Sequence, residues 1–150
     1  MKNNFAEIYA REQALRAQYR EARKGNDEAA MRQVRSDHAV LEGQIQEAGQ
    51  AYARLYRLYA SAMERGNAYI DLAEAHDYCD EAALISDMRA YGIDKFTLSS
   101  GCSSAIESAW RFTRNGCTLE GMIEINGGCK DFTTDAYEKC GALLFHVQEG

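Results

Sequence analysis

Apolar residues recur every three or four positions along the N-terminal part of the chain. The repeat runs from Phe5 to Ala22 and resumes from Met31 to Ala62. This spacing places the side chains on one face of a helix and is the period of a supercoiled helix pair. Gly25 and Asn26 interrupt the repeat, since a glycine suits a helix end and an asparagine suits a helix start. The pattern predicts a coiled-coil-like antiparallel helical hairpin over residues 2–65, with an unbroken second helix.

A short hinge also predicts the register of the two helices. Facing residue numbers should add up to about 50, which sets Glu12 opposite His38. These two residues are the only strongly polar ones at the seam positions. A buried polar pair can fix the register of two helices at some cost in stability. The alternative is that both side chains reach outward to the edge of the seam.

The end of the second predicted helix is apolar nearly all round, from Tyr52 to Met63. A helix that is apolar on every side is buried on several sides. The shorter first helix leaves this stretch without a partner in the hairpin. We therefore expect it to pack against the C-terminal unit and against a second copy of the chain, which predicts a homodimer.

Residues 67–148 show shorter elements separated by glycines. The expected order is a helix from Asp77 or Asp80 to Tyr91, strand 95–99, helix 104–115, strand 118–126, helix 134–140 and strand 142–147. This order predicts an α+β fold, in which a small three-stranded α/β unit follows the hairpin. Helix 104–115 should turn Ile106 and Trp110 inward. Along strand 118–126, alternation places Leu119 on the same face as Gly121, Ile123 and Ile125, and turns Glu120 and Glu124 outward.

Charge divides the chain at the same place. Residues 1–66 carry 11 Lys and Arg against 9 Asp and Glu, a net charge of +2. Residues 67–150 carry 6 against 14, a net charge of −8. The second part is therefore an acidic domain, and it should be drawn to a basic partner.

Several classes of protein do not fit this chain. No apolar run resembles a signal peptide, and none approaches the roughly 18 apolar residues of a membrane span. The five cysteines are an odd number, which favours free thiols in a reducing compartment. These features predict a cytoplasmic protein that does not bind membranes.

Candidate chemistry is sparse. Cys102 lies in the turn Ser99–Ser104, where a lowered thiol pKa would make it a nucleophile, but no local motif supplies a base. The simpler interpretation is a small buried residue. His76 and Cys79 could share a helix face, yet no pair of cysteines has zinc-module spacing. We therefore predict no catalytic residue, metal or cofactor, and keep a Cys102-dependent enzyme as an alternative.

Arginines gather on both sides of the predicted hinge. Together with Lys24, they outnumber the nearby acids Glu21, Asp27 and Glu28 by six to three. Such a tip can contact nucleic-acid phosphates, although a solvated face of mixed charge is the simpler interpretation. The candidate nucleic-acid-binding residues are Arg16, Arg20, Arg23, Arg32 and Arg35.

The run from Asp87 to Asn126, with Tyr69–Leu72 before it and Tyr137–Lys139 after it, carries a family resemblance. Over residues 67–147 the chain resembles small proteins of phages and conjugative elements in Gram-positive gut bacteria. Some of these are type II-A anti-CRISPR proteins, which inhibit the RNA-guided effector nuclease. The resemblance implies a non-enzymatic inhibitor in the host cytoplasm that binds the nuclease with its guide RNA and blocks DNA binding or cleavage.

The acidic charge suggests which surface would contact such a nuclease, because the nuclease holds nucleic acid in positively charged channels. The candidate partner-binding residues are Glu120, Glu124, Asp131 and Asp135. The alternative function is a nucleic-acid-binding accessory protein of a mobile element, in which the arginines contact DNA.

Overall fold

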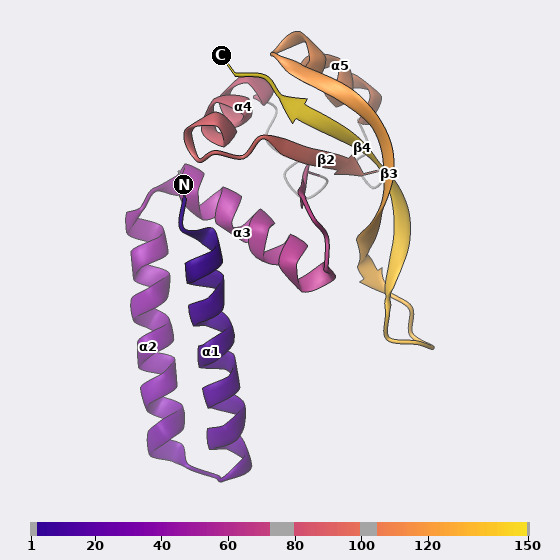
Figure 1. Ribbon diagram of the computed structural model, residues 1–150. Helices are drawn as coiled ribbons and strands as arrows, with labels where there is room; N and C mark the ends of the chain where they lie inside the picture. The colour runs from indigo at the N-terminus through magenta and orange to yellow at the C-terminus, as the bar shows by residue number, and fades with distance from the viewer. Residues whose placement is uncertain (1–2, 73–79, 100–104, 150) are drawn as a thin grey trace. The chain divides into compact units, whose positions relative to one another are not determined.

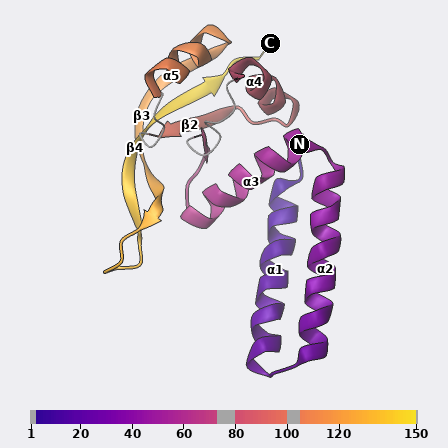
Figure 2. The ribbon, with the colours of Figure 1, turned by 180° about the vertical axis from the view of Figure 1, so that it is seen from behind.

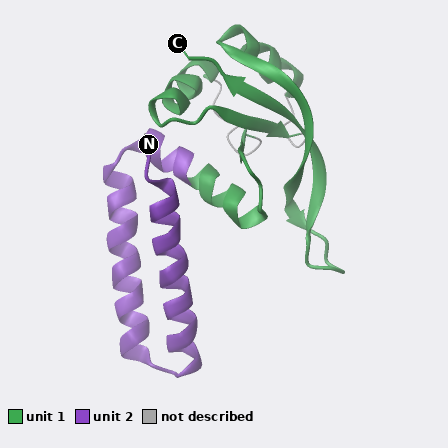
Figure 3. Ribbon diagram, in the orientation of Figure 1, with its two compact units in different colours: residues 1–2, 57–150 green, residues 3–56 purple. Residues whose placement is uncertain are grey.

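The computed structural model describes residues 3–72, 80–99 and 105–149, which form two compact units. Residues 3–56 form the first unit, and residues 57–149 belong to the second (Figure 3). The boundary falls inside helix α3 (Gln50–Arg65). In the described part of the chain, no helix is long and apolar enough to cross a membrane.

The N-terminal unit contains the predicted hairpin. Helices α1 (Phe5–Lys24) and α2 (Glu28–Glu47) pack side by side and are joined by a short turn (Figure 1). Asn26, which the sequence suggested as the residue that caps the second helix, lies in the turn with a positive φ of 54°. The residue that caps α2 is the next one, Asp27. The Asp27 carboxylate accepts a hydrogen bond from the Ala30 amide at 3.0 Å and thereby caps α2.

The prediction of an unbroken second helix is wrong. Helix α2 ends at Glu47, and α3 begins at Gln50 after Gly49, whose φ is +109°. Residues with a Cβ rarely adopt this backbone conformation, whereas glycine adopts it readily. The chain direction changes there and brings Tyr52 and Tyr56 back to Phe5, with ring centroids 5.1 and 5.8 Å apart.

This break changes the setting of the apolar stretch that favoured a dimer. Most of its large apolar side chains are buried, namely Tyr52, Leu55, Tyr56 and Leu58, and Met63 is the exposed one. The stretch is therefore not the uncovered overhang that the sequence suggested. The homodimer remains a prediction, and the apolar stretch no longer supports it.

The C-terminal unit contains a mixed sheet of four strands, one more than predicted. The strands are β1 (Ile70–Asp71), β2 (Lys95–Ser99), β3 (Cys117–Lys130) and β4 (Tyr137–Val147). Their order across the sheet is β1-β2-β4-β3 (Figure 1). Among the described strands, β1 and β2 pair in parallel, and β4 pairs antiparallel with both β2 and β3.

Two helices cover one side of this sheet, as Figures 1 and 2 show. They are α4 (Glu81–Ala90) and α5 (Ala105–Arg114), close to their predicted positions. The Phe112 ring of α5 packs 4.9 Å from the Phe96 ring and 5.7 Å from the Phe145 ring. The predicted inward face of α5 is wrong, because Ile106 is 90% exposed and Trp110 is 56% exposed.

The predicted helix 134–140 is also wrong. Tyr137–Cys140 is the first part of β4, and Gly141 lies within this strand, opposite Glu124, instead of ending a helix. A segment of seven residues is too short for periodicity to distinguish a helix from a strand. Pairing with the long β3 strand supplies the hydrogen bonds that favour the strand.

A β-bulge changes which residues of β3 share a face. The register shifts between Leu119 and Gly121, so Glu120 is the extra residue. Leu119 lies opposite Phe145 and Met122 lies opposite Leu143, which puts Leu119 and Met122 on the same face. The prediction that Leu119 shares a face with Gly121 is therefore wrong.

Part of β3 and β4 extends beyond the rest of the sheet. Among the described residues, β2 pairs with β4 at Ala142–His146, and residues 124–130 and 137–141 pair with each other. We call residues 124–141, including the connecting turn, the β3–β4 ribbon. Its base is held by Asn126, whose Nδ2 donates to the Arg65 carbonyl at 2.5 Å and whose amide donates to Asn67 Oδ1 at 2.9 Å.

The break at Gly49 predicts opposite effects for two glycine-to-alanine changes. Gly49→Ala should lower the free energy of unfolding by about 1–2 kcal/mol, because alanine is strained at this φ. Gly43→Ala lies within helix α2 and has no atom within 4 Å of its new Cβ. It should raise the free energy of unfolding by about 0.5–1 kcal/mol, since alanine favours helix.

Urea unfolding of the whole chain, followed by circular dichroism, measures both changes. Equal effects of the two substitutions would contradict the break at Gly49.

Candidate binding surfaces

The structure places Glu120 and Glu124 differently. Glu120, in the bulge, accepts a hydrogen bond from Lys95 Nζ at 3.2 Å. Its charge is thus partly offset by a neighbouring cation. Glu124 is exposed at the start of the β3–β4 ribbon, opposite Gly141.

Asp131 and Asp135 help to build the turn of the ribbon. Asp131 Oδ1 accepts hydrogen bonds from the Thr133 hydroxyl at 2.5 Å and from the Thr133 amide at 2.8 Å. These bonds hold the pKa of the Asp131 carboxyl below its usual value. Asp135 has a φ of 58°, and its amide donates to the Asp131 carbonyl at 2.8 Å. Both acids therefore have a local structural role, which the sequence interpretation missed.

The four predicted acids do not form one cluster. Glu120 lies at the bulge, Glu124 at the base of the ribbon, and the two aspartates at its turn. Between the aspartates, Phe132 is 97% exposed. Single exposed apolar residues are common on protein surfaces, and aromatic side chains are enriched at protein interfaces. The sequence around Phe132 did not predict that its side chain is exposed.

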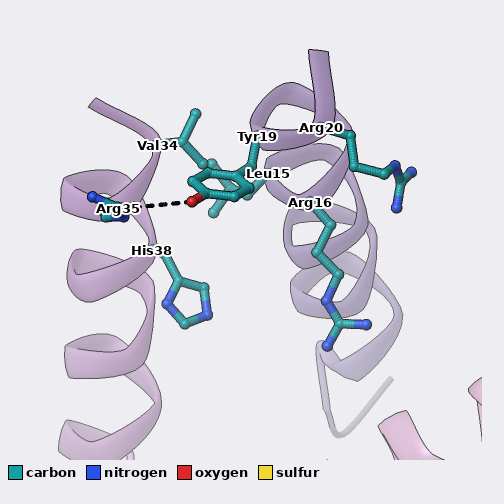
Figure 4. A pocket seen from close by; sticks show the side chains of 7 residues that line it. All are labelled: Leu15, Arg16, Tyr19, Arg20, Val34, Arg35 and His38. Atoms are coloured by element: carbon teal, nitrogen blue, oxygen red, sulfur yellow. Dashed lines mark hydrogen bonds between the residues drawn. The ribbon is translucent and has the colours of Figure 1, made fainter. Parts of the chain in front are cut away.

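A groove between α1 and α2 is the second candidate surface (Figure 4). Its volume is about 370 Å³. It combines an apolar floor with basic residues on both helices, and its lining residues are Leu15, Arg16, Tyr19, Arg20, Val34, Arg35 and His38. We call it the hairpin groove.

Three of the five predicted arginines line the hairpin groove, namely Arg16, Arg20 and Arg35. Arg35 Nη2 donates a hydrogen bond to the Tyr19 hydroxyl at 2.9 Å, and its guanidinium carbon lies 5.5 Å from the centre of the Tyr19 ring. Figure 4 shows the Tyr19 side chain reaching from α1 toward α2. Arg23 and Arg32 are exposed and do not line this groove.

Glu12 and His38 do meet across the hairpin, as their register predicts. Ligand atoms of Glu12, His38 and Glu42 all lie within 4.8 Å of one another. His38 Nε2 is 3.7 Å from Glu42 Oε1 and its side chain is half-exposed, whereas Glu12 is only 9% exposed. Only one of the two polar residues is therefore buried.

The main partner of Glu12 comes from α3. The Tyr56 hydroxyl donates to Glu12 Oε1 at 2.5 Å, and Arg16 Nη2 lies 3.9 Å from Glu12 Oε2. The sequence interpretation missed Tyr56, because an unbroken helix would carry it away from Glu12. Burial first, and then the bond to the Glu12 carboxylate, raise the pKa of the Tyr56 hydroxyl above its ordinary value of 10.0.

Glu12, His38 and Glu42 have the donor types of a metal site. However, Glu12 Oε1 already accepts a hydrogen bond from Tyr56, and Glu12 Oε2 forms an ion pair with Arg16, so this carboxylate has partners within the chain. The other predicted candidates for metal binding or catalysis, His76, Cys79 and Cys102, lie outside the described residues.

Two of the described cysteines, Cys117 and Cys140, do not have the environment of a nucleophile. Burial raises the pKa of the Cys117 thiol to about 11 and also raises the pKa of Cys140. A nucleophilic cysteine requires the opposite shift, because the thiolate is the reactive form.

Removal of the Tyr56 hydroxyl should destabilise the protein. Tyr56→Phe leaves a buried carboxylate without its closest donor and should lower the free energy of unfolding by about 1–3 kcal/mol. Tyr19→Phe removes a more exposed hydroxyl and should cost less than about 0.5 kcal/mol. Urea unfolding at neutral pH compares the two variants.

The same bond predicts a pH dependence. Because the pKa of Tyr56 is higher in the folded state, its contribution to stability is complete below pH 10.0 and decreases as the pH rises further. The Tyr56→Phe variant should lose less stability than the wild type above this pH. An identical loss in both proteins would contradict the assignment.

A family model matches the C-terminal part of the chain. Residues 54–147 match the model of a family described as "Domain of unknown function (DUF7698)". The matched segment begins inside α3 and ends with β4, so it contains the β3–β4 ribbon and leaves the α1–α2 hairpin outside. No curated protein and no solved structure matches the chain.

Proposed function

We propose that this chain, which belongs to the DUF7698 family, is a non-enzymatic inhibitor of a type II CRISPR effector nuclease. In this proposal the protein binds the nuclease loaded with guide RNA and blocks DNA binding or DNA cleavage. The resemblance of residues 67–147 to phage and mobile-element proteins suggests this target. The surface that makes the contact is argued from the structure.

The charge of the C-terminal unit supports a basic partner. Residues 67–150 have a net charge of −8, and the nuclease exposes positively charged channels for its guide RNA and target DNA. Complementary charge accelerates association and orients the two partners. Such binding needs no catalytic residue in the inhibitor.

The β3–β4 ribbon is the observation that carries the proposal. It is a two-stranded extension of the sheet with four acids, two lysines and a net charge of −2, and its turn carries the exposed Phe132 ring. Strong protein interfaces combine an apolar or aromatic anchor with polar groups around it. A narrow acidic ribbon also has the form that can enter a channel built for nucleic acid.

The extent of the family match supports the same assignment. Both the resemblance and the match include the ribbon and exclude the α1–α2 hairpin. We therefore assign nuclease binding to the ribbon, with Glu124 and Phe132 at the centre of the contact. Glu120 contributes less because Lys95 already pairs with it.

A cleavage assay tests this function directly. The reaction contains a type II-A nuclease with guide RNA, a target DNA and the purified protein. Wild-type protein should prevent cleavage, and Glu124→Lys combined with Phe132→Ala should weaken inhibition at least about tenfold, or about 1.4 kcal/mol. Both side chains are exposed, so the circular dichroism spectrum should stay unchanged.

A matched control makes the same two changes on another surface of the same unit. Glu107→Lys combined with Trp110→Ala alters an exposed acid and an exposed aromatic residue of α5. This variant should inhibit like the wild type, and so should Cys102→Ala. Absence of inhibition by the wild-type protein would reject the function, whereas equal losses in the ribbon and α5 variants would reject the ribbon as the contact surface.

A further inference from the structure

We infer that the hairpin groove is a binding site for single-stranded nucleic acid. The groove belongs to the N-terminal unit and lies outside the segment that matches the family. This inference therefore does not depend on nuclease inhibition.

The charges around the groove suit a polyanion. Arg16 and Arg20 are four residues apart on α1, which separates them by about 6 Å along the helix axis. Arg35 presents a third guanidinium from α2. Cations repeated along one side and present on the other can contact successive phosphates of one strand, and each guanidinium can bind a phosphate with two hydrogen bonds.

The floor of the groove suits nucleic-acid bases. Leu15 and Val34 supply apolar surface, and Tyr19 supplies an aromatic ring. The hydrogen bond from Arg35 holds this ring between the two helices. A positive groove with aromatic side chains is the arrangement by which proteins bind single strands without reading their sequence.

The shape of the groove favours a single strand over a duplex. Proteins that read duplex DNA generally insert a helix or a ribbon into a DNA groove. Here the concave surface belongs to the protein, and a space of about 370 Å³ between two helices admits unstacked bases. A peptide of glutamates shares the negative charge but lacks planar rings to contact Tyr19.

Acidic residues limit the site at one end. Glu12 lies next to Arg16, and Glu42 lies next to His38. Their carboxylates would repel a phosphate, so we place the bound strand on the side of the groove nearer to the α1–α2 turn. Arg20 and Arg35 then make the main phosphate contacts.

Fluorescence anisotropy of the full chain with a labelled oligothymidine of about 20 nucleotides tests the site. Binding should be saturable at about 50 mM NaCl and weaken steeply by about 200 mM. The triple variant Arg16→Gln, Arg20→Gln, Arg35→Gln should lose at least about tenfold in affinity. The slope of log affinity against log salt should become shallower by about 1.4, because each of the two main phosphate contacts contributes about 0.7.

A charge-matched control separates the groove from general electrostatic attraction. Arg11→Gln, Lys24→Gln, Arg57→Gln removes the same charge from exposed positions of α1 and α3 without altering the groove lining. This variant should lose less than about threefold, because its charges are exposed and screened by salt. Circular dichroism and the unfolding midpoint should show that both variants remain folded.

Four results would overturn the inference. They are absence of saturable binding at the lower salt concentration, equal losses in the two triple variants, equal competition by a duplex of the same length, and tighter binding of a glutamate-rich peptide than of the oligothymidine. The last result would identify the groove as a protein-binding site instead.

Discussion

The positive φ of Gly49 is the backbone constraint on which the N-terminal unit depends. It ends α2 and directs α3 so that Tyr56 reaches the Glu12 carboxylate in the hairpin seam. Without this reversal, a buried carboxylate would lack its closest donor, which is costly inside a protein. The hairpin groove begins one turn further along α1. Arg16 lines this groove and also forms an ion pair with Glu12. The groove itself is lined by α1 and α2.

Two surfaces of opposite charge follow from the division of the chain. The ribbon of the C-terminal unit is acidic and aromatic, whereas the hairpin groove of the N-terminal unit is basic with an apolar floor. At physiological salt, interactions between exposed charges are largely screened beyond about 8 Å. Each surface can therefore select a partner by its local charge, and a net charge of −6 for the whole chain does not prevent phosphate binding at the groove.

Local signals in the sequence predicted the elements whose stability depends on local contacts. The helical repeat gave the hairpin and the approach of Glu12 to His38, which the structure confirms. Features decided by distant contacts were missed. The apolar repeat continues across Gly49 although this glycine breaks the helix. Gly141 resembled a helix end, but it lies within β4 and pairs with β3. The ribbon acids were found as residues, but their separation and the exposure of Phe132 depend on strand register and on the turn.

The central claim is that the β3–β4 ribbon contacts the effector nuclease. Hydrogen–deuterium exchange of the full chain, alone and with the nuclease loaded with guide RNA, tests this contact without any substitution. A bound surface excludes water and restrains local opening, so amide exchange slows there. We predict slower exchange across residues 124–141 in the complex, with the largest change in the turn around Phe132. Unchanged exchange in the ribbon, with protection confined to α1 and α2, would contradict the account.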